Sequence, residues 1–435
     1  MRSVIVLAFA GVLAAQSPPP DKVTVTQAVQ EAIDRNLGLL AERYNLSVAE
    51  AKIVTARLRP NPVFSAGLDY IDFLRAFNHE NQGGPTEWNA RTDFVLERGG
   101  KREARISVAE TSRDVAKLNL LNTTRGLVLD VQNAFIDVLQ AKDNAALARE
   151  NLAAFQGIVT VNQTRVAAGD LSKVELVRTQ VAALQFQSAL RQAESKLRIA
   201  INKLQLLIGR AVPSPTFDVV GDLQRAGPPL ELPQLTSQAL QMRPDVLALR
   251  RDQARSQAEL RSQLAQGKVD YTVGTEYHRE FHNGNASALG VFFSAPIPLF
   301  NKNQGEIERA RQEMAQAEAR VKALEASVES DVRNAWLQYT TSRDLLDSIE
   351  RGLLTQAKDV RDTMEYSYRR GEASLVEFLD AQRAFNDARQ SYNDARADFA
   401  RSLYTIESVA GSGSQGSGAG GNAGTAAGAA LEKKQ

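Results

Sequence analysis

The chain repeats part of its own sequence, and this repetition constrains the fold more than any other feature. Residues 164–177 read TRVAAGDLSKVELV, and residues 366–379 read YSYRRGEASLVEFL. Gly169 matches Gly371 and Ser172 matches Ser374, at an offset of 202 residues. The segments DVQNAF (130–135) and DVRNAW (331–336) form a second matching pair. We therefore expect two copies of one structural unit.

Apolar residues recur every seven positions after each copy of the Gly/Ser segment. They are Leu176, Ala183, Leu190, Leu197 and Leu204 in the first copy, and Phe378, Phe385, Tyr392, Phe399 and Ile406 in the second. This spacing is typical of helices that pack along their whole length, so each copy predicts an antiparallel helical hairpin. Residues 101–168 contain no proline and only two glycines. As one helix they would be ~100 Å long, which predicts an elongated protein.

Two segments in each copy change to a period of two. Phe64, Ala66 and Leu68 alternate with polar or small residues, and residues 88–97 and 269–277 show the same alternation. One apolar and one polar face indicate a strand that lies between two environments. Leu289, Val291, Phe293 and Ala295 continue the apolar face on the strand paired with 269–277. Each copy is thus predicted to contain a β-hairpin, and the chain four strands.

The composition suits a helical protein and is compatible with a compartment outside the cytosol. Aromatic residues make up 6% of the 435 residues, the net charge is +1, and there is no cysteine. Nothing indicates a nucleic-acid partner. Residues 1–16 resemble a secretory signal, with Arg2 before the apolar run 4–14, the alternative being a disordered or buried N-terminus. No later stretch approaches the ~20 apolar residues of a membrane helix, so membrane insertion would have to use strands.

These patterns divide the chain into five parts, all of them expectations. Residues 1–16 are the signal peptide, and 17–209 are the first repeat, with a β-hairpin at 63–97 and a helical hairpin at 101–208. Residues 210–233 are a proline-rich connector. Residues 234–410 are the second repeat, with a β-hairpin at 269–298 and a helical hairpin at 304–409. The Gly/Ala/Ser-rich residues 411–435 are a disordered tail.

A sheet in lipid must close, because open edges leave backbone groups without partners in hydrocarbon. Known membrane barrels begin at about eight strands, so four strands per chain require several chains to share one barrel. The predicted fold class is therefore mainly α: a long antiparallel coiled-coil helical barrel continuous with a β-barrel shared between subunits.

The chain resembles the TolC-like outer-membrane efflux family from about residue 24 to 410. The resemblance rests on the opening helix 25–36 and its repeat at 235–245, the strand ends FVLERGGKREARI (94–106) and APIPLFNKNQGEI (295–307), and the turn at 368–382. The proline-rich strand end is most similar to the heavy-metal and small-molecule branch. The resemblance implies a homotrimer with about twelve barrel strands, an outer-membrane location with the helices in the periplasm, a membrane-fusion adaptor and a resistance–nodulation–division (RND) pump. Many relatives carry a lipid-anchored cysteine, which this chain lacks.

The resemblance also implies functional positions at the hairpin ends. Acidic residues there ring the periplasmic entrance, which assigns Glu175, Glu377 and Asp380 to a gate, with Arg178 as a partner for Asp380 and Tyr368 among the closing contacts. The alternative is a solvated helix surface. Adaptor contact is assigned to the turn residues Gly169, Leu171, Ser172, Gly371, Ser374 and Leu375. Ala373 stands where some relatives have an arginine in the gate network.

No catalytic constellation, cofactor motif or metal site is predicted. His278 and His282 are four residues apart but flank the tip of a predicted β-hairpin, where that spacing does not converge, and His79 is isolated. The favoured function is a passive exit duct for small molecules or metal ions in a tripartite efflux system. The alternatives are the exit duct of a type I protein-secretion system and, in another class, a periplasmic coiled-coil scaffold.

Overall fold

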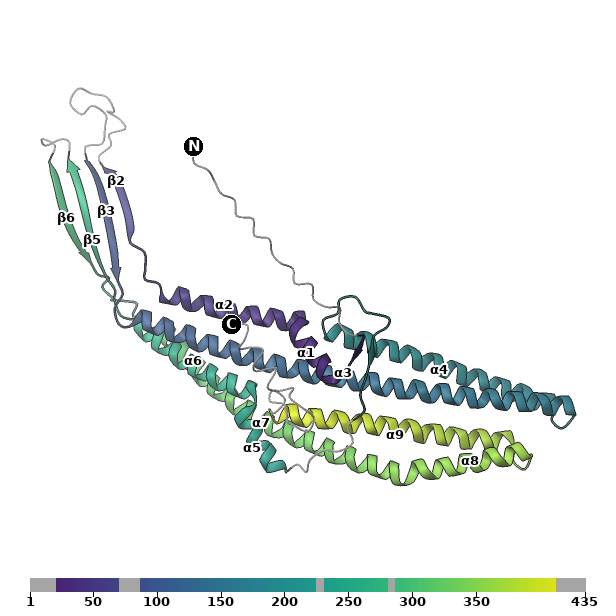
Figure 1. Cartoon of the computed structure of the whole chain (residues 1–435). Helices are drawn as coiled ribbons and strands as arrows, with labels where there is room; N and C mark the ends of the chain where they lie inside the picture. The colour runs from purple at the N-terminus through teal and green to yellow at the C-terminus, as the bar shows by residue number, and fades with distance from the viewer. Residues whose placement is uncertain (1–20, 70–86, 224–230, 281–285, 412–435) are drawn as a thin grey trace, which may run out of the picture. The chain divides into compact units, whose positions relative to one another are not determined.

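The computed structural model describes residues 21–69, 87–223, 231–280 and 286–411 (Figure 1). The predicted signal peptide, His79, His282 and nearly all of the predicted tail lie outside the described residues. The first repeat contains α1 (Val25–Arg35), α2 (Leu37–Arg57), β2 (Val63–Asp69), β3 (Glu87–Leu96), α3 (Lys101–Ala168) and α4 (Lys173–Leu207). The second contains α5 (Leu232–Met242), α6 (Pro244–Gln266), β5 (Tyr271–Glu280), β6 (Ser287–Ser294), α7 (Gln304–Ser348), α8 (Leu354–Arg370) and α9 (Leu375–Val409).

The second repeat's counterpart of α3 is not one continuous α-helix. A π-helical turn, η1 (Ile349–Leu353), separates α7 from α8. The two repeats explain its position. The segments 130–135 and 331–336 match at an offset of 201 residues, whereas Gly169 and Gly371 match at 202, so the second repeat has one extra residue between these points. A single inserted residue is what a π turn accommodates within a helix, and η1 lies in that interval.

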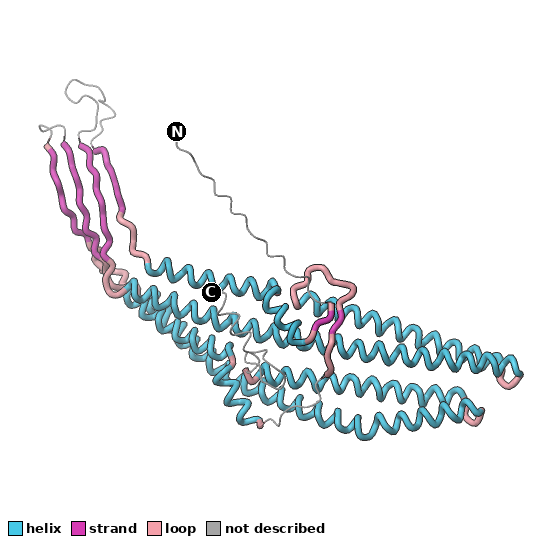
Figure 2. Tube along the Cα trace, viewed as in Figure 1, coloured by secondary structure: helices cyan, strands magenta, loops and turns pink. Residues whose placement is uncertain are grey.

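The four long strands form one antiparallel sheet in the order β2-β3-β5-β6 (Figure 2). Its register pairs Leu68 with Trp88, Ala90 with Tyr277, and Tyr277 with Leu289. The predicted apolar positions therefore share one face across all four strands: Phe64, Ala66, Leu68, Trp88, Ala90, Thr92, Phe94, Leu96, Tyr271, Val273, Thr275, Tyr277, Leu289, Val291 and Phe293. The alternation read from the sequence is confirmed as a two-faced sheet.

The opposite face of the sheet is polar. Arg91 donates to Asp93 over 2.9 Å, and the Arg91 guanidinium lies 4.5 Å from the centre of the Phe292 ring. His278 lies on this face of β5, with its Nε2 atom 3.6 Å from Glu87 Oε2. In the described ranges no group of three or more His, Cys, Asp or Glu side chains could hold a metal ion. No helix of these ranges is long and apolar enough to span a bilayer.

The chain forms two compact units, and each combines segments of both repeats. One unit comprises the described residues within 36–129, 226–344 and 402–435. It holds the sheet together with α2, the first part of α3, α6 and α7, which are joined by polar contacts. Arg102 Nε donates to the Arg57 carbonyl over 2.7 Å between α3 and α2, and Arg250 bonds Glu325 over 2.7 Å between α6 and α7.

The other unit comprises the described residues within 1–35, 130–225 and 345–401. It contains both hairpin turns, with residues 130–168 of α3, all of α4 and α8, and most of α9. Polar pairs link α3 to α9 along their length: Asn151 with Gln382, Asn144 with Asn393, and Asp137 with Arg401. A short parallel pair, β1 (Lys22–Val23) with β4 (Asp218–Val219), belongs to the same unit. This unit holds every residue that the sequence assigns to the gate or the turns.

Candidate functional site at the ends of the helical hairpins

The two hairpin turns share one backbone design. Gly169 and Gly371 have φ of +87° and +81°, a conformation that glycine adopts without steric cost. In each turn the residue after the glycine donates its backbone N–H to the carbonyl five positions earlier. Asp170 N donates to Arg165 O over 2.8 Å, and Glu372 N donates to Ser367 O over 2.9 Å. These are the bonds of a Schellman motif, so both turns follow from the position of the glycine.

The serine after each turn caps the returning helix. Ser172 Oγ accepts from the Glu175 backbone N–H over 3.2 Å, and Ser374 Oγ accepts from that of Glu377 over 3.3 Å. At the second turn the Glu377 carboxylate also accepts from the Ser374 backbone N–H over 2.8 Å, which completes a capping box. This backbone hydrogen bond, aided by the Ser374 hydroxyl, lowers the pKa of Glu377. The predicted gate carboxylate Glu377 is thus engaged with its own turn.

The other predicted gate residues are on the surface of the single chain. Asp380 lies 3.6 Å from Arg383 on its own helix, in an exposed ion pair. Arg178 is exposed and makes no ion pair with Asp380 in the described part of the chain, and Glu175 is half-buried. The structure therefore does not bring Arg178 and Asp380 together within one protomer.

Tyr368, predicted among the closing contacts, is buried between helices of both repeats. Its hydroxyl accepts from Asn162 Nδ2 over 2.7 Å, and the same Nδ2 donates to Thr179 Oγ1 over 2.9 Å. Thr179 in turn donates to the Glu175 carbonyl over 2.9 Å. All three side chains are almost fully buried. We name this set, Asn162, Thr179 and Tyr368, the polar cluster; it joins α3 and α4 to α8.

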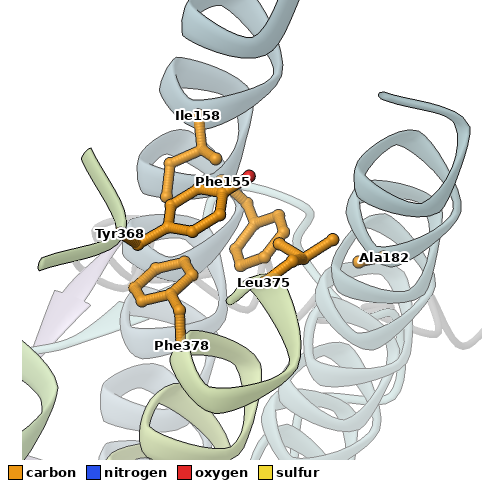
Figure 3. Close-up of a cluster of buried hydrophobic side chains, with 6 residues drawn as sticks. All are labelled: Phe155, Ile158, Ala182, Tyr368, Leu375 and Phe378. Carbon is orange, nitrogen blue, oxygen red and sulfur yellow. The ribbon is translucent and has the colours of Figure 1, made fainter. Parts of the chain in front are cut away.

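Tyr368 of the polar cluster also belongs to a core of buried side chains with Phe155, Ile158, Ala182, Leu375 and Phe378 (Figure 3). The Tyr368 and Phe378 rings stack at 5.5 Å, and Phe378 stacks on Phe155 at 5.9 Å. Leu375 points into this core and is only 2% exposed. Its assignment to adaptor contact needs correction, because Leu375 is the first residue of α9 and faces inward. Gly169, Ser172, Gly371 and Ser374 are exposed, and Leu171 is half-buried.

Sequence reasoning missed two groups at this end of the molecule. Asn162 lies seven residues after Phe155, a spacing that could have placed it in the core. Val174 and Val376 occupy the same position of the two repeats and are exposed apolar residues beside the turns. Their signal was the repeat match itself, since the same apolar residue stands next to the turn in both copies.

Comparison with known proteins gives consistent results across the chain. The model of the Outer membrane efflux protein family matches residues 28–210 and 235–412. The cobalt-zinc-cadmium resistance protein CzcC of Cupriavidus metallidurans is 27% identical over 363 residues, 83% of each chain. The nickel-cobalt-cadmium resistance protein NccC of Alcaligenes xylosoxydans xylosoxydans is 23% identical over 78% of this chain and 74% of that protein. The crystal structure of CusC superposes with a TM-score of 0.74 at 18% identity, covering 89% of this chain and 92% of that one.

Proposed function

The chain belongs to the outer membrane efflux protein family, and on that basis we propose that it is the exit duct for divalent metal cations expelled by an inner-membrane pump. The family resemblance seen in the sequence is confirmed, and so is the location: an outer-membrane efflux protein whose helical part lies in the periplasm. The family consists of passive channels and not of enzymes. The metal cargo rests on one observation, the 27% identity to a cobalt-zinc-cadmium resistance protein over 83% of both chains.

The proposed duct is a homotrimer in which three sheets close one barrel of about twelve strands. Two features of the sheet support this. Its apolar face is continuous over four strands, as lipid contact requires. In the described residues β2 and β6 each pair on one side only, so each leaves an edge that a neighbouring subunit's strand would satisfy.

The proposed partners are a periplasmic membrane-fusion adaptor and an RND-type pump. We assign the adaptor contact to the exposed turn residues Gly169, Ser172, Gly371 and Ser374 with the half-buried Leu171, and add Val174 and Val376. Two equivalent turns per chain would give a trimer six similar contacts. Aspartate at Val174 and Val376 should abolish export while the trimer still assembles. Normal export by that variant would remove the assignment.

The proposed gate uses charge that symmetry multiplies. Glu175 and Asp380 lie within two helical turns of the hairpin ends, and three copies would make a ring of like charge that attracts divalent cations. Arg178 and Arg383 would set the strength of that ring. Glu377 contributes its charge from within the capping box. Because Asp380→Asn removes charge and leaves both caps intact, it should weaken divalent-cation block in a planar bilayer, and unchanged block would contradict the gate.

The cargo is tested in cells that lack the chromosomal copy and carry either the intact chain or an empty vector. After exposure to zinc, cobalt or cadmium salts, the cells without the chain should retain several-fold more of the metal, measured by mass spectrometry of washed cells. Sensitivity to organic antibiotics should be unchanged. Equal metal content together with increased antibiotic sensitivity would reject the metal cargo but not the membership of the efflux family.

A further inference from the structure

The loop between β6 and α7, residues 296–303, exposes an unusual amount of apolar surface. Ile297 is 78% exposed, Leu299 71% and Phe300 91%. Three large apolar side chains within four residues are unfavourable in water, since their burial would remove apolar surface from the solvent. A cluster of this kind on one loop indicates a surface that another apolar phase covers.

The loop is held in place by contacts with α6. Asn303, in the left-handed conformation with φ of +65°, donates from Nδ2 to the Gln263 carbonyl over 2.8 Å and to Gln263 Oε1 over 2.9 Å. The Lys302 carbonyl lies 2.8 Å from where a Cβ atom on Gly267 would be, so only glycine allows this approach. The exposed side chains are thus presented by an anchored backbone.

The loop forms one wall of an open cavity of ≈ 500 Å³ whose charged lining is mostly basic. Lys101, Lys268 and Lys302 line it, against the single carboxylate of Asp270. Lys101 is buried and donates to Asp270 over 2.7 Å, and Asp270 also accepts from the Arg98 backbone N–H over 2.9 Å. Lys268 and Lys302 are exposed and have no carboxylate partner within the described ranges. The lining carries two positive charges in excess.

The loop continues the apolar face of the sheet. Leu289, Val291 and Phe293 lie on that face of β6, and the chain passes from β6 directly into the loop. Tyr271 packs against Phe293 at the same end, with the Arg98 guanidinium 4.1 Å from the Tyr271 ring centre. Because α3, α6 and α7 adjoin this end and the helices lie in the periplasm, it is the periplasmic boundary of the membrane. Aromatic residues and arginine at such a boundary are typical of membrane anchoring.

We propose that this cavity and loop bind an anionic phospholipid of the inner leaflet of the outer membrane. The lipid phosphate lies in the cavity between Lys268 and Lys302, and the acyl chains run along Leu299, Phe300 and Phe293. The site gives the duct a fixed depth in the membrane at the point where sheet becomes helix. The inference rests on the proposed barrel, in which the apolar face of the sheet meets lipid, and not on the identity of the cargo.

The depth of the loop in the membrane is tested by tryptophan fluorescence. The native tryptophans are replaced (Trp88→Phe, Trp336→Phe), and Phe300→Trp becomes the only probe in the full-length protein, reconstituted into phosphatidylcholine–phosphatidylglycerol vesicles. Bromines placed near the headgroup end of the acyl chains should quench the emission of this probe strongly, and bromines at the chain ends weakly. The control probe is Val212→Trp, an exposed position on the connector, and it should not be quenched. If no bromolipid quenches the probe at position 300, the lipid site is rejected. A blue-shifted emission without quenching would also reject it, because burial against a neighbouring subunit produces the same shift.

The role of the Lys268 and Lys302 charges in lipid binding is tested in the otherwise native chain. The protein and the variant Lys268→Gln/Lys302→Gln are incubated with equal amounts of phosphatidylglycerol and phosphatidylcholine, and the lipids retained are counted by native mass spectrometry. The native protein should prefer phosphatidylglycerol, and the variant should lose that preference by about an order of magnitude, as expected for two lysines near an anionic surface. The control variant Lys322→Gln removes an exposed α7 lysine that pairs with Glu318 and should keep the preference. Equal preference in the native protein and the double variant rejects the headgroup site.

Discussion

Asn162 shows how one polar residue in a coiled-coil core can fix the pairing of helices. It occupies a core position, and its Nδ2 atom bonds both Thr179 and Tyr368, while its Oδ1 atom is buried without a partner. A buried polar group with an unsatisfied atom costs stability, so alternative packings that leave Nδ2 unpaired as well are disfavoured further. The polar cluster therefore specifies which turn of α8 lies against α3.

The polar cluster predicts a specific effect of removing one hydroxyl. Tyr368→Phe keeps the ring that stacks on Phe378 but leaves one Asn162 Nδ2 proton unpaired in the core. We expect a loss of about 1–2 kcal/mol in the free energy of unfolding, measured by denaturant titration of the far-UV circular dichroism. Tyr366→Phe is the matched control, since Tyr366 is exposed, and its effect should stay within about 0.5 kcal/mol. Equal effects of the two changes would contradict the role of the cluster.

Glu377 predicts a pH dependence with a definite sign. Its pKa is lowered in the folded chain, so the ionised carboxylate stabilises the fold above its ordinary value of 4.5, and the contribution is lost as pH falls through the folded pKa. Glu377→Gln can still cap but does not titrate. The difference in melting temperature between native protein and variant should be constant over roughly pH 5 to 8 and shrink at more acid pH. A difference that stays constant down to acid pH would contradict this role of the Glu377 carboxylate.

At the scale of elements, the sequence predicted the type of each element and the apolar face of each strand better than the point at which a helix is interrupted. The strands and their apolar faces follow from apolar residues at every second position. The α3 helix ends at a turn in which Gly169 adopts a positive φ. The capping box at the second turn also has a sequence pattern, a serine (Ser374) three residues before a glutamate (Glu377). The only sign of the π turn η1 in the sequence is that the offset between the two repeats changes from 201 to 202 residues. This change is seen when both matching pairs are compared.

The origin of η1 as a one-residue insertion predicts opposite outcomes for two deletions. Removing Gly352 should convert α7, η1 and α8 into one continuous helix and leave Tyr368 facing the core, because the extra residue is gone. Removing Gly157 from α3, which has no π turn, should rotate Asn162 and the first turn by about 100° relative to Phe155. We expect the Gly352 deletion to assemble in the outer membrane and the Gly157 deletion to fail, as judged by membrane fractionation. Failure of both, or of the Gly352 deletion alone, would refute this origin.

The two faces of the sheet predict opposite tolerance of charge in one strand. Thr275 lies on the apolar face of β5, paired with Thr92 and Val291, and Thr272 lies on the polar face, paired with Val95 and Ser294. Thr275→Arg should cost about 2–4 kcal/mol if that face meets lipid near the bilayer centre, whereas Thr272→Arg should be tolerated. The measurement is the yield of heat-modifiable oligomer in outer-membrane fractions. A similar yield from both variants would argue against lipid contact on the predicted face.

At the scale of the whole molecule, the sequence indicated a duplicated chain but not how its pieces combine. Each compact unit draws segments from both repeats, and nothing local in a heptad says which partner helix it will meet. Leu375 illustrates the limit: position next to a turn suggested exposure, and tertiary packing buried it. The proposed acidic gate would form only between subunits, because Asp380 pairs only with Arg383 within the described part of one chain.

The proposed barrel predicts contact between the two outer strands of neighbouring subunits. The chain has no cysteine, so introduced thiols report only designed contacts. Ser65→Cys on β2 is combined with a cysteine at Ala288, Phe292 or Ser294 on β6, all on the polar face, and treated in membranes with a short thiol crosslinker. At least one combination should give covalent dimers and trimers on denaturing gels, because β6 of one subunit then lies beside β2 of the next. The control pair Val95→Cys/Thr272→Cys joins strands already adjacent within one chain and should stay monomeric. If every combination of β2 with β6 cysteines gave only monomers, the sheets could not be neighbours, and one chain would have to satisfy both edges alone.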